Sequence, residues 1–388
     1  MIAEYLSNEN KEWIQKVYTL LCEKMEKECE RVRDTFPDVP KNGRYQVDLG
    51  KKDIASWVNG FWGGMLWQMY HATKHKEYRL TAEKLEGRLD SAFDEYRGLH
   101  HDVGFMWLPT AVVDYKLTGN ERSKVRGLHA ANLLAGRYNP AAKFIRAWNP
   151  HKRNGRMEDC IGWMIVDCLM NIPILYWAAK EDNNPAYMYI AKSHADTALK
   201  YILREDGSCN HIVVIDPQSG ELVRVQEGQG FSTESAWSRG QAWAIYGFAL
   251  SAKYTKDTRY LSAAKKVANY FIACTDKTNH VPVCDFRAPK QPFLTDTSAG
   301  ACAVCGMLEI AEQLESYERE FYIESAINIL KAIEKNYGNW NMEQDGLLDG
   351  ARGSYHCNEP QEGSSFIFGE YYYVEAILRV AEKHISIW

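Results

Sequence analysis

Helical periodicity through nearly the whole chain is the feature that most restricts its fold. Apolar residues recur at helical spacing in twelve segments of similar length, whereas the alternation typical of strands is scarce. Breaks fall at turn-forming clusters such as Asn183-Asn184-Pro185, where proline suits the first position of a helix. The predicted helices cover residues 8–36, 54–74, 76–97, 104–118, 121–137, 159–180, 185–203, 235–255, 257–274, 296–315, 317–336 and 365–384.

The connections between these helices predict one closed domain over residues 1–388. No Pro/Ser-rich linker, composition step or exact internal repeat divides the chain, and the lack of a regular repeat argues against a solenoid. A ring of six helical hairpins would bury the apolar stripe of each helix against its neighbours. We therefore expect an all-α fold, an (α/α)6 barrel.

One segment departs from the helical pattern. Residues 211–215 and 221–225 are rich in Ile and Val, and they flank the turn-forming run Asp216-Pro217-Gln218-Ser219-Gly220. This pattern predicts a small β-hairpin inserted between two helices.

Charge and composition exclude several classes of protein. The net charge is −5, from 46 basic and 51 acidic residues, and no basic stripe indicates a nucleic-acid partner. The charged N-terminal stretch lacks the apolar core of a signal peptide, and no apolar run predicts a membrane span. The ten cysteines are therefore expected to be reduced thiols, and the protein cytoplasmic. We expect a monomer or a weak homo-oligomer.

Asp102 stands in a polar stretch just before an aromatic-rich helix start. It follows His100 and His101 and precedes Gly104. Aspartate can cap a helix by accepting hydrogen bonds from its first N–H groups. It can instead face a ligand, because loops at one rim of a barrel are where binding residues are expected. The spacing leaves both interpretations open.

Asp167 lies in a strongly apolar stretch with no basic residue within four positions. A carboxylate buried there is costly unless it is hydrogen-bonded, and burial raises its pKa. A raised pKa suits a general acid that works near neutral pH. The alternative is a cap for the helix that begins at Cys168. Asp159, in a more polar setting, is expected to be an ordinary cap.

Aromatic and basic residues meet again in the stretch 235–243. Arg239 and Trp243 are four residues apart, so they share one helix face, where a fork of donors beside a ring suits a sugar bearing a carboxylate. Packing could explain both residues as well. His211 and Gln229 frame the predicted hairpin just before this stretch.

Metal and phosphate chemistry is poorly supported. His100-His101 and the pair His71 and His75 lack further ligands at convincing spacing, so we expect no metal site. No glycine-rich phosphate loop follows a predicted strand, and no nucleophile elbow is present.

Taken together, seven stretches in the same order resemble the unsaturated glucuronyl hydrolases, glycoside hydrolases that act on 4,5-unsaturated uronic acids. Each stretch is weak alone, but the ordered set is specific and runs from Trp57 to the final helix. The stretches are Trp57-Val-Asn-Gly-Phe-Trp-Gly-Gly, His100-His-Asp-Val-Gly-Phe, Val166-Asp-Cys-Leu-Met-Asn-Ile-Pro-Ile-Leu, Trp237-Ser-Arg-Gly-Gln-Ala-Trp, Asp296-Thr-Ser-Ala-Gly, Gly353-Ser-Tyr-His and Gly369-Glu-Tyr-Tyr-Tyr-Val-Glu-Ala.

The resemblance implies an (α/α)6 glycosidase that releases 4,5-unsaturated glucuronic acid from the non-reducing end of lyase-made, glycosaminoglycan-type oligosaccharides. The implied reaction is acid/base-catalysed hydration of the C4=C5 bond, with no metal or organic cofactor. By motif, Asp167 matches the general acid/base and Asp102 its partner carboxylate. The implied substrate-binding residues are Trp57, His101, Trp148, His211, Gln229, Arg239, Trp243, Tyr355 and His356.

Two departures from the family pattern limit what the resemblance implies. Glu370 stands where an aspartate is expected, and residues 358–365 have no confident match, which leaves substrate preference open. Three rival interpretations remain: an unsaturated galacturonyl-rhamnose hydrolase, a sugar 2-epimerase with paired histidines, and a non-catalytic carbohydrate-binding toroid.

Overall fold

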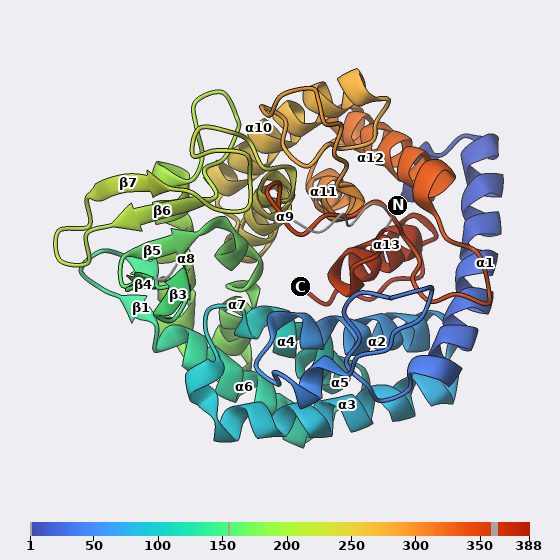
Figure 1. Cartoon of the computed structure of the whole chain (residues 1–388), viewed down its shortest axis with the longest axis horizontal. Coiled ribbons are helices and arrows are strands. Elements are labelled where there is room, and N and C mark those ends of the chain that lie inside the picture. Colours follow the sequence, from blue (N-terminus) through green and yellow to red (C-terminus); the bar gives the residue numbers. More distant parts are fainter. Residues whose placement is uncertain (1, 154–155, 358–363) are drawn as a thin grey trace.

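Helices alternate between an outer and an inner layer around a ring (Figure 1). The computed structural model describes residues 2–153, 156–357 and 364–388. The outer layer holds α1 (Asn8–Val32), α3 (Lys76–Asp94), α6 (Glu121–Ala135), α8 (Pro185–Tyr201), α10 (Thr258–Thr275) and α12 (Ser316–Tyr337). The inner layer holds α2 (Phe61–Thr73), α4 (Val103–Trp107) with α5 (Val113–Thr118), α7 (Pro173–Glu181), α9 (Ser238–Thr255), α11 (Thr297–Glu312) and α13 (Ile367–Val380). The expected (α/α)6 barrel is confirmed.

Burial distinguishes the two layers. The inner helices α9 and α11 are buried on all sides over residues 238–252 and 297–311. The outer helix α10 buries one stripe that includes Tyr260, Ala264 and Val267, at a spacing of three and four residues. A helix that is apolar all round has to lie between other elements, whereas a striped helix can face water. The distribution of apolar residues along each helix therefore indicates whether that helix lies in the inner or the outer layer.

The predicted hairpin is confirmed, but it belongs to a larger sheet. Strands β6 (Ile212–Ile215) and β7 (Leu222–Gln226) pair antiparallel, and β5 (Trp163–Ile165) pairs with the other edge of β6. The helix predicted over residues 159–180 is wrong in its first half, since β5 and a 3-10 turn (Val166–Met170) precede α7. A short apolar run buried on both faces has no periodicity that separates strand from helix.

Two further short antiparallel pairs lie beside this sheet. Strands β1 (Tyr138–Asn139) and β2 (Phe144–Ile145) form one, and β3 (His151–Arg153) and β4 (Arg156–Glu158) form the other. The sheets lie together at one side of the ring (Figure 1).

The C-terminal segment lies inside the ring (Figure 1). The Trp388 ring stacks on Tyr372 of α13 at 5.8 Å between centroids, and its Nε1–H donates to Glu375 Oε2 at 2.9 Å. Phe105 of α4 contacts both Trp388 and Trp243, so these rings form an aromatic floor in the barrel. Among the described helices, none has the length and apolarity needed to span a membrane.

Candidate active site

A cavity of about 610 Å³ opens where the start of α4, the 3-10 turn Val166–Met170 and two loops meet. Its lining combines two carboxylates with histidines and tryptophan faces. The lining residues are Trp57, Arg97, Gly98, His100, Asp102, Trp148, Asn149, Pro150, His151, Asp167 and Gln229. The structure thus brings together five predicted site residues, namely Trp57, Asp102, Trp148, Asp167 and Gln229.

Asp102 precedes α4 but does not cap it. Its side chain makes no capping hydrogen bond, and its Oδ1 instead accepts from Asn171 Nδ2 at 2.9 Å. The backbone N–H of Phe105 is satisfied by Asn171 Oδ1 at 2.8 Å. Because Asn171 serves the helix start, the carboxylate of Asp102 is free to face the cavity.

Asn171 also ties the two carboxylate-bearing turns together. Its Nδ2 donates to the backbone oxygen of Asp167 at 3.2 Å as well as to Asp102. A Cβ at Gly104 would lie 2.5 Å from the Cα of Asn171, so the close approach of the turns requires glycine there. Sequence reasoning missed Asn171, although it lies four residues after Asp167 in a stretch already singled out.

Asp167 presents its carboxylate to the cavity from the 3-10 turn. Its side chain is 18% exposed, and its Oδ2 lies 3.5 Å from His211 Nε2. Within the described ranges, its carboxylate makes no hydrogen bond to a backbone N–H, so the capping alternative has no support. The apolar sequence around Asp167 predicts deep burial, but the more deeply buried carboxylate is that of Asp102, at 10% exposure.

The ring of His211 is held in one tautomer. The backbone N–H of Gln229 donates to His211 Nδ1 at 3.0 Å, so the proton of the neutral imidazole belongs on Nε2. That Nε2 is the atom that faces Asp167. A Cβ at residue 228 would lie 2.0 Å from Nδ1, so Gly228 is needed for this approach. His211 therefore offers a donor to Asp167.

Burial governs the ionisation around Asp102. Burial is the main cause that raises the pKa of Asp102 well above its ordinary value, and the charge of Asp167 adds to it. The hydrogen bond from Asn171 and the charge of Arg137 lower this pKa, but by less. Burial, aided by Arg137, lowers the pKa of His100 to about 4, and burial lowers that of His101 well below its usual range. Both imidazoles are therefore neutral near pH 7, and Asp102 keeps its proton to a higher pH than an ordinary carboxyl group does.

Arg239 lies behind the wall of the cavity rather than in it. Its guanidinium is 2% exposed and donates to Asp296 Oδ2 at 2.6 Å and to the backbone oxygens of Arg352 and Gly353. Gln229 Nε2 donates to the same Gly353 oxygen at 2.8 Å. Arg239 thus holds the loop against which Gln229 rests.

The remaining predicted residues surround the cavity at different depths. His101 is buried beneath Asp102, with Nε2 at 3.4 Å from Oδ1, and Trp243 is part of the aromatic floor. The backbone N–H of Tyr355 donates to Gln229, and the His356 ring lies 2.8 Å from the backbone oxygen of Phe231. Tyr355 and His356 therefore brace the wall that carries Gln229.

Four polar side chains of the cavity lining were not predicted as site residues: Arg97, His100, Asn149 and His151. Asn149 directly follows Trp148 and His151 lies three positions after it, so proximity to that tryptophan was an available signal. Arg97 stands in an ordinary polar stretch that carries no such signal.

Of the two departures noted in the sequence, Glu370 lies outside the cavity that holds the two carboxylates. Glu370 is buried, accepts a hydrogen bond from the Tyr45 hydroxyl at 2.8 Å, and does not line the cavity. Burial raises the pKa of Glu370 to about 7. Of the unmatched segment 358–365, residues 358–363 lie outside the described residues.

One group of side chains could approach a metal ion. Donor atoms of His100, His101 and Asp102 lie within 4.8 Å of one another. Three protein ligands suffice for a catalytic zinc site, but Asp102 Oδ1 already accepts from Asn171. The expectation that the chemistry needs no metal stays a prediction.

An (α/α)6 barrel with two carboxylates beside tryptophan faces has the parts of a glycosidase, because sugars need an acid/base pair and apolar platforms. Residues 24–384 match Glycosyl Hydrolase Family 88, and the chain belongs to this family. It is therefore a glycosidase.

Relatives of this chain carry consistent names. It is 34% identical over 362 residues to the unsaturated glucuronyl hydrolase of Bacillus sp. strain GL1, covering 92% of this chain and 93% of that one. It is 29% identical to the unsaturated chondroitin disaccharide hydrolase of Streptococcus pyogenes serotype M1, covering 99% and 94%. A structure of a Streptococcus agalactiae unsaturated glucuronyl hydrolase variant, complexed with dGlcA-GalNAc6S, has a TM-score of 0.80 at 27% identity, covering 97% and 93%.

Proposed function

We propose that this glycosidase releases 4,5-unsaturated glucuronic acid from the non-reducing end of glycosaminoglycan-type oligosaccharides made by polysaccharide lyases. The observation that carries the proposal is the pair Asp102 and Asp167 in one cavity, with a raised pKa on the buried member. The names of the relatives agree with this substrate class. The two rivals on a similar toroid that remain, a galacturonyl-rhamnose hydrolase and a 2-epimerase, have no observation in their favour.

The chemistry follows from the vinyl ether of the substrate. Protonation of C4 leaves an oxocarbenium-like centre at C5, and water adds there to give a hemiketal. Opening of the hemiketal releases the remaining sugar. One proton enters at C4 and one leaves the attacking water, so a single acid/base group balances the step.

We assign the proton transfer to Asp167, whose carboxylate is the more exposed of the two and is faced by the Nε2–H of His211. Asp102 lines the same cavity and holds ring hydroxyls. Trp57 and Trp148 offer faces to the sugar ring, and Gln229 offers an amide. Arg239, Trp243, Tyr355, His356 and His101 act by positioning these groups.

The direct test follows the ultraviolet absorbance of the conjugated uronate while the protein acts on unsaturated chondroitin, hyaluronan and heparin disaccharides. We expect the absorbance to fall, because hydration removes the double bond. Loss of absorbance only with unsaturated galacturonyl-rhamnose would transfer the assignment to that group of hydrolases. Sugar interconversion without loss of absorbance would indicate an epimerase.

Replacing Asn171 by leucine is expected to shift the ionisation of Asp102 upward in pH. The amide of Asn171 lowers the pKa of Asp102, so its loss leaves burial and the charge of Asp167 less opposed. In a plot of kcat/KM against pH, the limb that reflects the ionisation of Asp102 should move to higher pH. The value of kcat/KM at pH near 7 should fall about tenfold.

The matched control is Asn269→Leu on the outer helix α10, where Asn269 accepts a hydrogen bond from Tyr322. Its pH profile should match that of the wild type. An Asn171→Leu profile with unmoved limbs would show that Asn171 does not set the ionisation of Asp102.

A cytoplasmic location and a monomeric or weakly associated state complete the proposal. The cysteines Cys168, Cys302 and Cys305 are buried free thiols, as expected in a reducing compartment.

A further inference from the structure

Asp285 holds one loop with both of its carboxylate oxygens. The loop, residues 229–236, runs from the hairpin to α9. Asp285 Oδ2 accepts from the backbone N–H of Phe231 at 3.0 Å and from the hydroxyl of Ser235 at 2.6 Å, and Oδ1 accepts from the backbone N–H of Ala236 at 3.0 Å. Asp285 is 3% exposed and is not among the described residues that line the catalytic cavity. Any effect of this carboxylate on the cavity therefore passes through the loop.

The loop packs directly on this carboxylate at Gly230. A Cβ at Gly230 would lie 2.7 Å from Asp285 Oδ2 and 3.0 Å from Ser235 Oγ, so a side chain there would displace the loop or the carboxylate. Just after the loop, Trp237 pairs with Asp285 in an isolated antiparallel bridge. The loop is therefore fixed to Asp285 near both of its ends.

Both ends of this loop contact the ring of His211. At the start, the backbone N–H of Gln229 donates to His211 Nδ1 at 3.0 Å. At the end, the ring of Trp237 lies 4.3 Å from that of His211, centroid to centroid. An imidazole held in this way keeps Nδ1 as the acceptor and Nε2 as the donor, and Nε2 lies 3.5 Å from Asp167 Oδ2.

The direction of the Gln229 N–H depends on an anchor outside Gln229 itself. The oxygen of Gln229 accepts from the N–H of Tyr355 at 2.8 Å, and its side chain donates to the Gly353 oxygen at 2.8 Å. Neither contact involves the N–H. Gln229 also stands between Gly228 and Gly230, and glycine has the most conformational freedom of any residue. The carboxylate that packs on Gly230 supplies the missing restraint.

We propose that Asp285 is a positioning residue for the proposed hydration. Through residues 230–237 it keeps the Gln229 N–H on Nδ1 of His211. The Nε2 proton of His211 then stays directed at Asp167, whereas the opposite tautomer would turn a lone pair toward that carboxylate. The inference rests on the proposed function, because the donor serves the reaction only where Asp167 transfers the proton.

The test follows the tautomer of His211 and the turnover in two variants. Asp285→Asn puts an amide NH₂ where an oxygen accepts N–H groups, and Gly230→Ala keeps the carboxylate but moves the loop away from it. ¹⁵N NMR of histidine-labelled protein at pH about 8, where free imidazole is neutral, shows which ring nitrogen carries the proton. The variant His211→Gln identifies the signals.

We expect wild type to carry the proton on Nε2 of His211 and both variants to show a mixture of the two tautomers. The value of kcat for the unsaturated disaccharide should fall about 10- to 100-fold in both, because a small misplacement of a group beside the acid is costly. Thermal unfolding checks that each variant folds. Where Asp285→Asn does not fold, Gly230→Ala decides, since it removes no hydrogen-bonding group.

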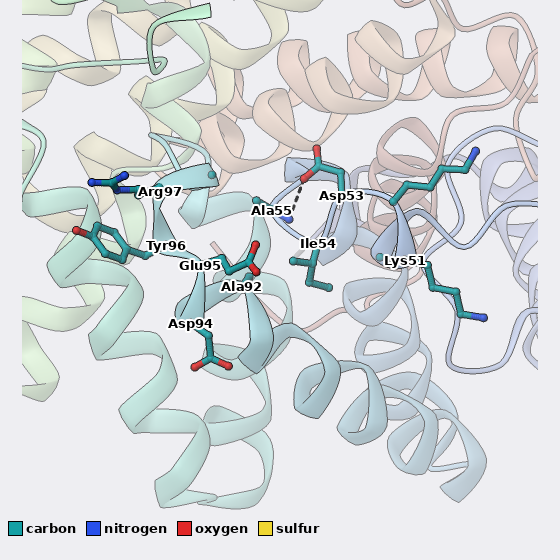
Figure 2. Close-up of a pocket in the computed structure, with 12 residues that line it drawn as sticks. Lys51, Asp53, Ile54, Ala55, Ala92, Asp94, Glu95, Tyr96 and Arg97 are labelled. Carbon is teal, nitrogen blue, oxygen red and sulfur yellow. Dashed lines mark hydrogen bonds between the residues drawn. The ribbon is translucent and has the colours of Figure 1, made fainter.

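Asp53→Asn is the matched control, because Asp53 also holds a loop through a backbone N–H. Its Oδ1 accepts from the N–H of Ala55 at 3.1 Å, the bond that Figure 2 shows dashed, in another pocket of about 720 Å³. Asp53 is exposed, and an asparagine oxygen can make the same bond. The tautomer of His211 and kcat should equal those of the wild type.

The tautomer separates positioning from a merely structural role. A proton that stays on Nε2 of His211 in both variants would overturn the proposal even if kcat falls, and so would a mixture of tautomers with unchanged kcat. A proton on Nδ1 in wild type, or a mixture in Asp53→Asn, would overturn it as well. The NMR measurement needs no substrate. A mixture confined to the variants of Asp285 and Gly230, in a protein whose wild type hydrates no disaccharide, would refute the proposed function while supporting the control of His211 by Asp285.

Discussion

Replacing Asp167 by asparagine is expected to lower kcat about 10²- to 10⁴-fold with little change in the free energy of unfolding. Asparagine keeps the size of the side chain but can neither deliver a proton to C4 nor take one from water. The carboxylate of Asp167 serves no capping bond in the described structure, so the fold does not depend on its charge. The measurement is the loss of ultraviolet absorbance at saturating substrate, together with thermal unfolding.

Asp159→Asn is the matched control for this prediction. Asp159 is exposed, and its Oδ1 accepts from the backbone N–H of Ile161 at 2.8 Å, which an asparagine oxygen can replace. Its kcat should equal that of the wild type. If Asp167→Asn retained nearly full activity, the acid role would pass to another group, with Asp102 the first candidate.

Replacing Arg379 by leucine is expected to lower the free energy of unfolding by about 3–5 kcal/mol. Arg379 on α13 is 1% exposed and pairs with Glu309 at 2.7 Å, Glu375 at 3.1 Å and Glu312 at 3.1 Å. Leucine would leave the buried carboxylates of Glu309 and Glu375 with less compensation, whereas Glu312 is 40% exposed. The measurement is chemical denaturation of the variant and the wild type at pH near 7.

The pH dependence of this loss has a defined sign. Burial raises the pKa of Glu309, yet Arg379 and Lys253 hold it below its ordinary value, so its contribution is present at neutral pH and fades in acid. Without Arg379 the buried acids bind protons more tightly when folded, and the variant loses stability as pH rises. The gap between variant and wild type should therefore be smaller at pH about 5 than at pH about 7.

Arg259→Leu provides the comparison for Arg379→Leu. Arg259 pairs with Asp257 at 2.7 Å, but its side chain is 59% exposed, so the same substitution should cost less than about 1 kcal/mol. Equal losses in the two variants would show that the buried network does not contribute more than a surface pair.

Local signals in the sequence were sufficient for much of the fold. Asn184 caps α8 by accepting from the N–H of Ala186, as the break before Pro185 indicates. The Asp216 turn and the hairpin it joins were also readable, because turn chemistry depends on neighbouring residues. The strand β5 was not, since its pairing with β6 joins residues about fifty positions apart, which no local pattern contains.

The ring of helices and the motifs that carry Asp102 and Asp167 could be predicted from the sequence, because periodicity and short motifs are local properties. Only the tertiary structure decided that Asn171 replaces Asp102 as the partner of the helix start, and that His211 presents Nε2 to Asp167. It also decided that Arg239 is committed to Asp296. Hydrogen bonds and charges act between residues that are close in space, and folding alone sets which distant residues become close.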